Sequence, residues 1–421
     1  MSTQTTETRQ IFLARQPIFD AANRVHGYEL LYRGTEDATA ADGPSEAMGP
    51  TVMVDSLLGM GLSEVTGGRP AYVNVTREML VDGAVELFDP EHVVLEVLET
   101  VEPDPPTLEA LEGLARAGYR IALDDFRYRP EVEPLLVLAA VVKIDVIEWE
   151  PAELKALVGK VRPYGASLLA EKVEDENAHQ RALDLGFDYF QGYHFSRPQT
   201  LARKDLSIEQ LNVMRLLNVV NDPDTSDLAL EKIFRGDISL SYKLLRMVNS
   251  AALGGRGISS IGHALRLLGR KSLYRWLALM LAANGATNGP RGELAHSALL
   301  RARMCERIAQ EAGHTGEAPA LYLTGLFSRL DALMGSSMAD LLDRLDLRPE
   351  VHQALSARRG PLAPVLNLVE AYEGGHWLEV PGLMKAARAS DLDLRELYID
   401  ALQDADRYLM AAQEKPEAKA G

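Results

Sequence analysis

YRIALDDF, residues 119–126, is the stretch that decides the fold of this chain. A short apolar run leads into two adjacent carboxylates, Asp124 and Asp125, and then an aromatic residue. Like charges packed together at the end of a buried segment are unfavourable unless a cation or a proton relieves them. The stretch therefore predicts a buried strand whose carboxyl end carries a charged site.

Apolar runs of the same kind recur on both sides of this stretch. They are GYELLYRG (27–34), AYVNV (71–75), HVVLEVLE (92–99), AVVKIDV (140–146) and SLLAEKVE (167–174). Segments with helical spacing of leucines lie between them, at 108–119, 151–165 and 176–187. This alternation predicts a parallel sheet covered by helices. Polar residues fall late in successive runs, as they do at the carboxyl-terminal face of a β/α barrel.

The second half of the chain has a different rhythm. From about Ser207 to Ala412, helical segments such as SIEQLNVMRLLNVV follow one another with almost no strand signal, which predicts an all-α domain. The fold class we expect is α/β, a compact TIM-like barrel, followed by an all-α domain. The barrel stretch is shorter than the ~250 residues typical of such barrels, so we expect trimmed helices or an irregular closure. The expected parts are a disordered N-terminus (1–10), the barrel (11–203), the all-α domain (204–390), and a C-terminal helix with a polar tail (391–421).

Composition narrows the classes of protein that this chain can belong to. It has 421 residues, a formal net charge of −17 and one cysteine, Cys305. Strong acidity makes DNA an improbable partner, because binding to phosphates needs clustered Lys and Arg. A disulfide framework within the chain is excluded. MSTQTTETRQ at the N-terminus has no apolar core, and the longest apolar runs are too short to cross a bilayer, so we expect a cytoplasmic protein without a membrane anchor.

Polar residues near the strand ends form one candidate site. Most of their side chains offer oxygen ligands, which suit Mg²⁺ or Mn²⁺ rather than zinc. Two such ions could stabilise the attacking and the leaving oxygen of a phosphodiester displacement. Singly, Asn74 is typical of a strand-end turn, Lys143 of an ion pair, and Asp125 of a helix cap. Their conjunction on successive strands favours a functional site. The set is Glu29, Asn74, Glu96, Asp124, Asp125, Lys143, Glu171 and Gln191.

These motifs make residues 11 to about 200 resemble the EAL domain family of cyclic-di-GMP phosphodiesterases. The signatures stand in order as Glu29-Leu30-Leu31, YVNVT, LEVLE, LDDF, KID, AEKVE and FQGY. The resemblance implies a barrel that linearises cyclic-di-GMP to pGpG with two Mg²⁺ or Mn²⁺ ions. LARQPIF and GYELLYRG resemble the subfamily in which an EAL domain is joined to an HDOD domain.

The resemblance also implies a role for each matching residue. Glu171 would complete the metal site or activate water, Lys143 would orient water or phosphate, and Gln191 would fix the same network. Arg33 would hold a substrate phosphate. Glu174, which we group with the catalytic residues, and Glu99 would shape the loop of the site. The metal ligands would be Glu29, Asn74, Glu96, Asp124 and Asp125, with Asp125 on the second ion.

Two departures from the family pattern bear on activity. Leu30 replaces alanine on a core-facing strand, and Arg127 replaces the glycine that often follows DDF. Glycine tolerates conformations that arginine adopts only with strain. This loop lies next to the metals and tends to take part in dimerisation, so the resemblance implies a homodimer through the barrel, and Arg127 predicts weakened turnover.

Residues 237–277 resemble the HDOD domain, a relative of the HD phosphohydrolases. Those enzymes need an adjacent His-Asp pair, which this sequence lacks; His263 and His296 stand singly and are predicted to be packing or surface residues. We therefore expect the helical half to bind an unknown protein partner. Its small basic cluster is explained by a solvated helix face. Two hypotheses remain open: an active phosphodiesterase, and a catalytically silent receptor that signals through the HDOD domain.

Overall fold

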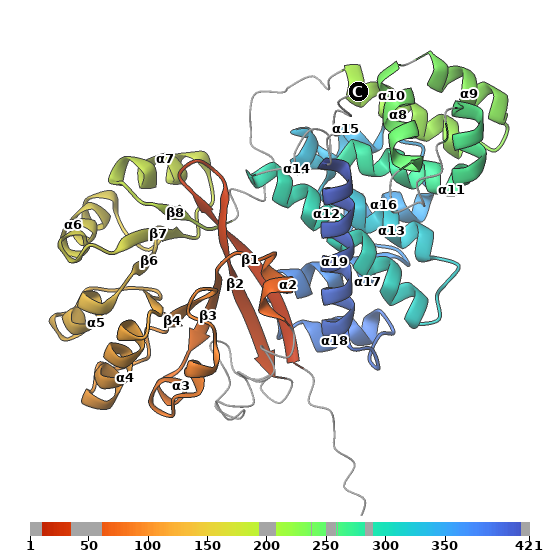
Figure 1. Cartoon of the computed structure of the whole chain (residues 1–421). Coiled ribbons are helices and arrows are strands. Elements are labelled where there is room, and N and C mark those ends of the chain that lie inside the picture. The colour runs from red at the N-terminus through yellow and green to blue at the C-terminus, as the bar shows by residue number, and fades with distance from the viewer. Residues whose placement is uncertain are drawn as a thin grey trace, which may run out of the picture.

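The structure is a computed structural model and describes residues 11–34, 61–192, 208–236, 238–249, 258, 260–282 and 289–413. The N-terminal stretch and the polar tail that we expect to be disordered lie outside these residues. A barrel, red to yellow in Figure 1, stands beside a helical half, green to blue. This arrangement confirms the predicted fold class.

The barrel is closed, and its strands are neighbours in chain order. Strands β2 to β8 run parallel to one another, as predicted. Strand β1, which the sequence analysis did not assign, runs antiparallel to both β2 and β8. The strands are β1 (Ile11–Asp20), β2 (Val25–Gly34), β3 (Ala71–Val75), β4 (Val93–Val97), β5 (Arg120–Leu123), β6 (Val141–Asp145), β7 (Ser167–Glu171) and β8 (Tyr189–Phe190).

Short helices cover the outside of the barrel, which explains its small size. Their ends follow local signals: Asp104 caps the helix after β4 by accepting from the Thr107 amide, and Asp175 does the same for Ala178. The helices are α2 (Leu62–Thr66), α3 (Arg77–Val81), η2 (Ala84–Leu87), α4 (Pro105–Arg116), η3 (Pro130–Val132), α5 (Glu133–Leu138), α6 (Pro151–Val161), η4 (Arg162–Tyr164) and α7 (Glu176–Leu185).

The helical half contains no strand among its described residues. Its longest helices, α11, α12 and α19, share one core, and α12 is buried on nearly all sides. The helices are α8 (Ile208–Asn221), α9 (Asp227–Arg235), α10 (Ile238–Val248), α11 (Ile261–Ala282), α12 (Gly289–Glu311), α13 (Ala318–Phe327), α14 (Leu330–Met334), α15 (Met338–Leu342), α16 (Pro349–Ala357), α17 (Ala363–Glu373), α18 (Val380–Ala386) and α19 (Leu394–Gln413). Within the described part of the chain, no helix is long and apolar enough to cross a membrane.

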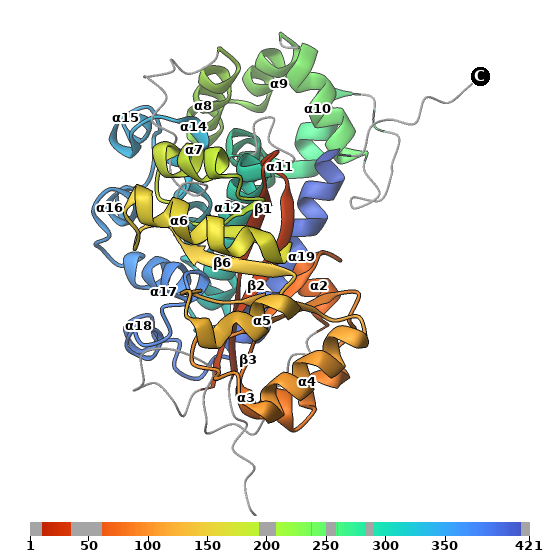
Figure 2. The same ribbon diagram turned by 90° about the vertical axis from the view of Figure 1, so that its left-hand side faces the viewer.

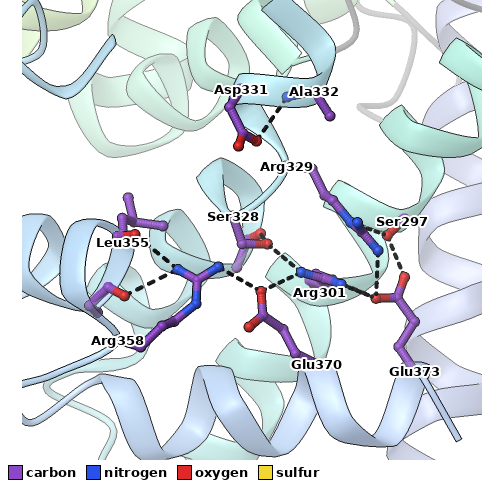
Figure 3. Close-up of polar contacts among 12 residues, drawn as sticks. Ser297, Arg301, Ser328, Arg329, Asp331, Ala332, Leu355, Arg358, Glu370 and Glu373 are labelled. Atoms are coloured by element: carbon purple, nitrogen blue, oxygen red, sulfur yellow. Dashed lines mark hydrogen bonds and ion pairs between the residues drawn. The ribbon is translucent and has the colours of Figure 1, made fainter. Parts of the chain in front are cut away.

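A network of charges lies inside the helical half (Figure 3). Arg301 on α12 donates to Glu373 and Glu370 on α17, both at 2.5 Å, and to the Ser328 hydroxyl at 3.2 Å. Only 6% of the Arg301 side chain is exposed, so these partners balance a charge that is almost fully removed from water. Arg358 donates to Glu370 from the opposite side at 3.0 Å. The network ties α12 to α17.

The two halves meet along the first strand of the barrel. Helices α12, α17 and α19 pack on β1, and α19 also packs on α2 (Figures 1 and 2). The Phe12 ring stacks on Trp377 of the helical half at 5.7 Å and meets the edge of Tyr372 at 5.9 Å. Packed aromatic side chains therefore form part of the contact between the two halves.

Candidate metal centre

The strands deliver the predicted side chains to one end of the barrel. Asn74 and Glu96 are register partners on β3 and β4, and Asp124 directly follows β5. Glu171 is the last residue of β7 and Gln191 directly follows β8. Neighbouring parallel strands in register place their final residues side by side, so the strand ends predicted by the sequence meet in space.

Lys143 lies at the centre of the site. Its Nζ is 2.8 Å from Asp124 Oδ1, 2.9 Å from Glu171 Oε1 and 3.4 Å from Glu29 Oε2, and it also contacts Glu96. Only 1% of the lysine side chain is exposed. The four carboxylates come from or directly follow four different strands, β2, β4, β5 and β7, and Lys143 on β6 gathers them around one positive charge.

Glu29 receives a second donor from the far side of the site. The Gln191 side-chain amide donates to Glu29 Oε2 at 2.6 Å, which connects β8 with β2. Tyr32, further along β2, donates its hydroxyl proton to the Asn74 carbonyl. These bonds fix β2 against β3 and β8, and so fix the position of the Glu29 carboxylate.

Several oxygen atoms of the site are buried without a hydrogen-bond partner. A buried acceptor that receives no hydrogen bond is costly, and a cation is one group that can satisfy it. Carboxylate and amide oxygens are also the ligands that hard divalent cations prefer. The site therefore fits such ions by its donor set. These atoms are Asn74 Oδ1, Glu96 Oε2, Glu171 Oε2 and Gln191 Oε1.

The described residues do not, however, contain three His, Cys, Asp or Glu side chains that converge on one ready-made metal position. The reason is visible in the geometry: the carboxylates point at the Lys143 ammonium, which stands among them. Metal binding at this place requires their oxygens to turn from the ammonium toward an ion.

Charge repulsion shapes the proton affinities in the site. Burial raises the pKa of Glu171 to about 8, and the negative charges of Asp124 and Glu29 act in the same direction, against Lys143. Burial likewise raises the pKa of Glu96. Burial lowers the pKa of Lys143, but the surrounding carboxylates outweigh it and the net shift is upward. The cluster thus carries more negative charge than its lysine can neutralise.

Other predicted residues lie outside this cluster. Asp125 is exposed, and its backbone has a positive φ of 39°, a conformation that non-glycine residues adopt at a cost. Glu99 and Glu174 are exposed after β4 and β7. The backbone of Arg33 lies in β2 opposite Phe12, and its side chain lies outside the described residues.

Sequence reasoning assigned no role to Asp145 or Lys172. Asp145, the end of the KID signature, is 4% exposed and accepts from Lys172 Nζ at 2.6 Å. Lys172 directly follows Glu171 and has a positive φ of 51°. The signal was present in the sequence, since Asp145 ends its apolar run as the other polar residues do.

The loop after Asp125 is tied to the next loop. Arg127 pairs with Glu148, and both side chains are largely exposed. Arg127 is not among the described non-glycine residues with positive φ; in this loop Asp125 holds that conformation. The expected backbone strain at Arg127 is therefore wrong, and the arginine acts instead as a clip between the loops after β5 and β6.

Two residues of the basic cluster Arg266, Arg270, Lys271 and Arg275 have partners within the chain, whereas Arg266 and Lys271 are exposed, as expected of a solvated helix face. Arg270 donates to the Asp222 carbonyl at 2.9 Å, and Arg275 pairs with Glu306. His263 is exposed, whereas His296 is 6% exposed and makes contacts between the halves. His296 is therefore a buried packing residue.

Comparison with known proteins defines the class. Residues 210–345 match the family model of the HDOD domain. The cyclic di-GMP phosphodiesterase CdgJ of Vibrio cholerae is 33% identical over 372 residues, which cover 87% of this chain and 85% of CdgJ. The chain therefore belongs to the family in which an EAL barrel is joined to an HDOD domain.

Two further similarities are found. YuxH of Bacillus subtilis is 30% identical over 377 residues, which cover 87% of this chain and 92% of YuxH. Among solved structures, a calcium and cyclic-di-GMP complex of BlrP1 from Klebsiella pneumoniae is 22% identical with a TM-score of 0.38, and the match covers 47% of this chain and 58% of BlrP1.

Proposed function

We propose that the barrel is a cyclic-di-GMP phosphodiesterase that hydrolyses its substrate to pGpG with two divalent ions, Mg²⁺ or Mn²⁺. The observation that carries the proposal is the cluster of buried carboxylates around Lys143, with acceptor oxygens left without partners. The family relationship to CdgJ, whose name states this activity, supports the same reaction.

The charge balance of the site supports two ions. In the metal-free protein the raised pKa values of Glu96 and Glu171 favour their protonated forms, and cation binding would release those protons. Fully ionised, Asp125 and the four carboxylates around Lys143 carry five negative charges against one positive charge, an excess of four. Two divalent cations would neutralise that excess. Bound there, they would stabilise charge on the phosphodiester oxygens and make water a better nucleophile.

The residues have separate roles in this proposal. Lys143, released from part of its carboxylate contacts, would direct its ammonium to the attacking water or to a phosphate oxygen. Gln191 would hold Glu29 in place, and Glu171 would complete the metal site or help to activate the attacking water. Glu99 and Glu174 would support the loops, and Arg33 would bind a substrate phosphate. The ion ligands would be Glu29, Asn74, Glu96, Asp124 and Asp125.

The remaining parts of the proposal concern assembly. We propose a homodimer through the barrel, supported by the exposed apolar side chains of Val137 on α5 and Ile147 after β6.

The HDOD half would bind a protein partner, for which the exposed Leu228 and Tyr242 on the packed pair α9 and α10 offer apolar surface. A cytoplasmic location remains a prediction.

The test is incubation of the purified protein with cyclic-di-GMP and Mn²⁺ or Mg²⁺, with pGpG followed by chromatography. Glu29→Ala should abolish turnover, while Glu112→Gln, on the exposed face of α4, should leave it unchanged. Binding of cyclic-di-GMP in calorimetry without formation of pGpG would establish the silent receptor instead. If the protein neither hydrolyses nor binds cyclic-di-GMP, both the phosphodiesterase and the receptor function are overturned.

A further inference from the structure

The starting point is an incomplete strand pairing at the closure of the barrel. Strand β1 pairs with β2 along most of its length but with β8 only at Phe19 and Asp20. Among the described residues, no strand lies beside the second edge of β1 from its start to Ile18. Open edges carry backbone amides that need other partners.

The helical half supplies those partners. The Leu13 amide donates to the Tyr372 hydroxyl on α17 at 3.2 Å, and the Arg15 amide donates to the Tyr398 hydroxyl on α19 at 3.3 Å. Leu13, Tyr372 and Tyr398 are at most 1% exposed. Two buried hydroxyls thus stand where a neighbouring strand would have placed carbonyl groups.

Arg15 is the centre of the contact. Its guanidinium donates to the Val65 carbonyl on α2, lies 3.1 Å from His296 Nε2 on α12, and covers the Tyr28 ring at 4.1 Å. His296 Nε2 is in turn 2.9 Å from Asp406 on α19. This side chain, 8% exposed, joins β1, β2 and the barrel helix α2 to α12 directly and to α19 through His296.

The same contact reaches the strand that carries Glu29. Tyr28, the residue before Glu29, donates its hydroxyl proton to Glu293 on α12 at 2.8 Å. Across the strand pair, Gln16 opposes Glu29 and Arg15 opposes Leu30. On the other side of Glu29, a Cβ on Gly375 would come within 2.9 Å of Leu31. Glu29 is therefore flanked along β2 by residues that touch the helical half.

The helical side of the contact is itself rigidly held. His296 and Tyr372 each precede a member of the charge network in Figure 3, Ser297 and Glu373, and those two side chains hydrogen-bond to one another. A movement of α12 relative to α17 would break this network and shift the tyrosine and histidine that hold β1.

We propose that the helical half controls metal binding in the barrel by holding the β1–β2 strand pair, with Arg15 as the positioning residue. Displacement of this pair moves the Glu29 carboxylate away from Gln191 and Lys143, whose donor groups both contact Glu29 Oε2. A partner that rearranges the helical half would therefore change the affinity of the barrel for its cations. This inference rests on the proposed function, since it concerns the same ligand set.

The test compares Mn²⁺ affinity by calorimetry in the full chain and in Tyr398→Phe, Tyr372→Phe and Arg15→Lys variants. Loss of one hydrogen bond between β1 and the helical half should raise the Mn²⁺ dissociation constant by about 2- to 12-fold, the range that one typical hydrogen bond is worth. Tyr274→Phe is the matched control, because Tyr274 belongs to α11, outside the three helices that pack on β1. It should leave the Mn²⁺ affinity unchanged.

Hydrogen exchange over residues 25–34, measured without metal, provides a second readout. The proposal expects faster exchange in Tyr398→Phe and Tyr372→Phe than in the wild type, and no change in Tyr274→Phe. Unchanged Mn²⁺ affinity in well-folded Tyr398→Phe, Tyr372→Phe and Arg15→Lys proteins would overturn the proposal, even if their thermal stability falls. If wild-type protein binds no Mn²⁺, the proposed function fails, and unchanged exchange would separately refute the mechanical link.

Discussion

Replacing Lys143 with methionine isolates the charge at the centre of the site. Methionine is unbranched and fills a similar buried volume, so the change removes the ammonium with little loss of packing. At an effective dielectric constant of about 20, one carboxylate about 3 Å from an ammonium attracts it by roughly 5 kcal/mol. Lys143 has contacts of this kind with four carboxylates, which also repel one another.

The net effect is smaller than the sum of these attractions, because burying the lysine costs solvation. Breaking a buried ion pair typically destabilises a protein by ~3–5 kcal/mol, and we expect that loss for Lys143→Met at pH 7.5 in the presence of a chelator. The loss should shrink at pH 5, where the abandoned carboxylates take up protons. Mn²⁺ should recover most of it, because the ion replaces the missing positive charge.

The measurement is urea unfolding of the wild type and Lys143→Met, each with chelator and with Mn²⁺. Lys160→Met is the control: this lysine is exposed, rests on the Tyr128 ring at 4.3 Å, and should matter by less than ~1 kcal/mol. Our account of the site would be refuted if Lys143→Met were as stable as the wild type in chelator, or if Mn²⁺ failed to stabilise the variant.

Three further predictions concern the surroundings of the cluster. Burial raises the pKa of Glu171 from 4.5 to about 8, so between these pH values the folded, metal-free protein keeps a proton that the unfolded chain has released. Its unfolding free energy should therefore fall as pH rises through this window, and Glu171→Gln should flatten the slope measured by urea unfolding. Gly192→Ala should destabilise the protein by ~1–3 kcal/mol and weaken Mn²⁺ binding in calorimetry. The reason is that a Cβ at residue 192, next to Gln191, would lie 2.3 Å from the Val173 nitrogen. Unchanged stability and Mn²⁺ affinity would contradict this tight packing. Glu148→Gln should change the unfolding free energy by less than ~1 kcal/mol, because the ion pair with Arg127 is exposed. It should nevertheless lower pGpG formation several-fold, because it frees the loop after Asp125. Turnover equal to that of the wild type would show that the Arg127–Glu148 pair has no role in catalysis.

Much of the barrel could be predicted because its signals are local. AYVNV was expected to be a strand and forms β3 over the same residues, and the helix expected over 151–165 forms α6 over Pro151–Val161. Apolar runs that end on polar residues reveal both the strands and the face they share. The same pattern predicts that Glu96, Asp124 and Glu171 belong to one site.

The features that could not be predicted from the sequence depend on side-chain direction or on contacts between segments far apart in the chain. A strand-end position indicates which face a residue approaches but not where its side chain points, so Lys143 was expected to orient water rather than to stand among the carboxylates. The antiparallel β1 gave no clear period, since it is covered on both sides. Arg15 and His296 lie 281 residues apart, and no local pattern links them.

The capping of β1 by the helical half has a consequence for how the chain folds. The Leu13 amide meets its partner 359 residues later, and the Arg15 amide meets its own 383 residues later. Contacts of such long range slow folding, because the loop between them must close first. A nascent chain that has already made the whole barrel therefore still carries an open strand edge, which can pair with the edge of another molecule. We expect synthesis of this protein to depend on chaperones until the helices α17 and α19 have emerged.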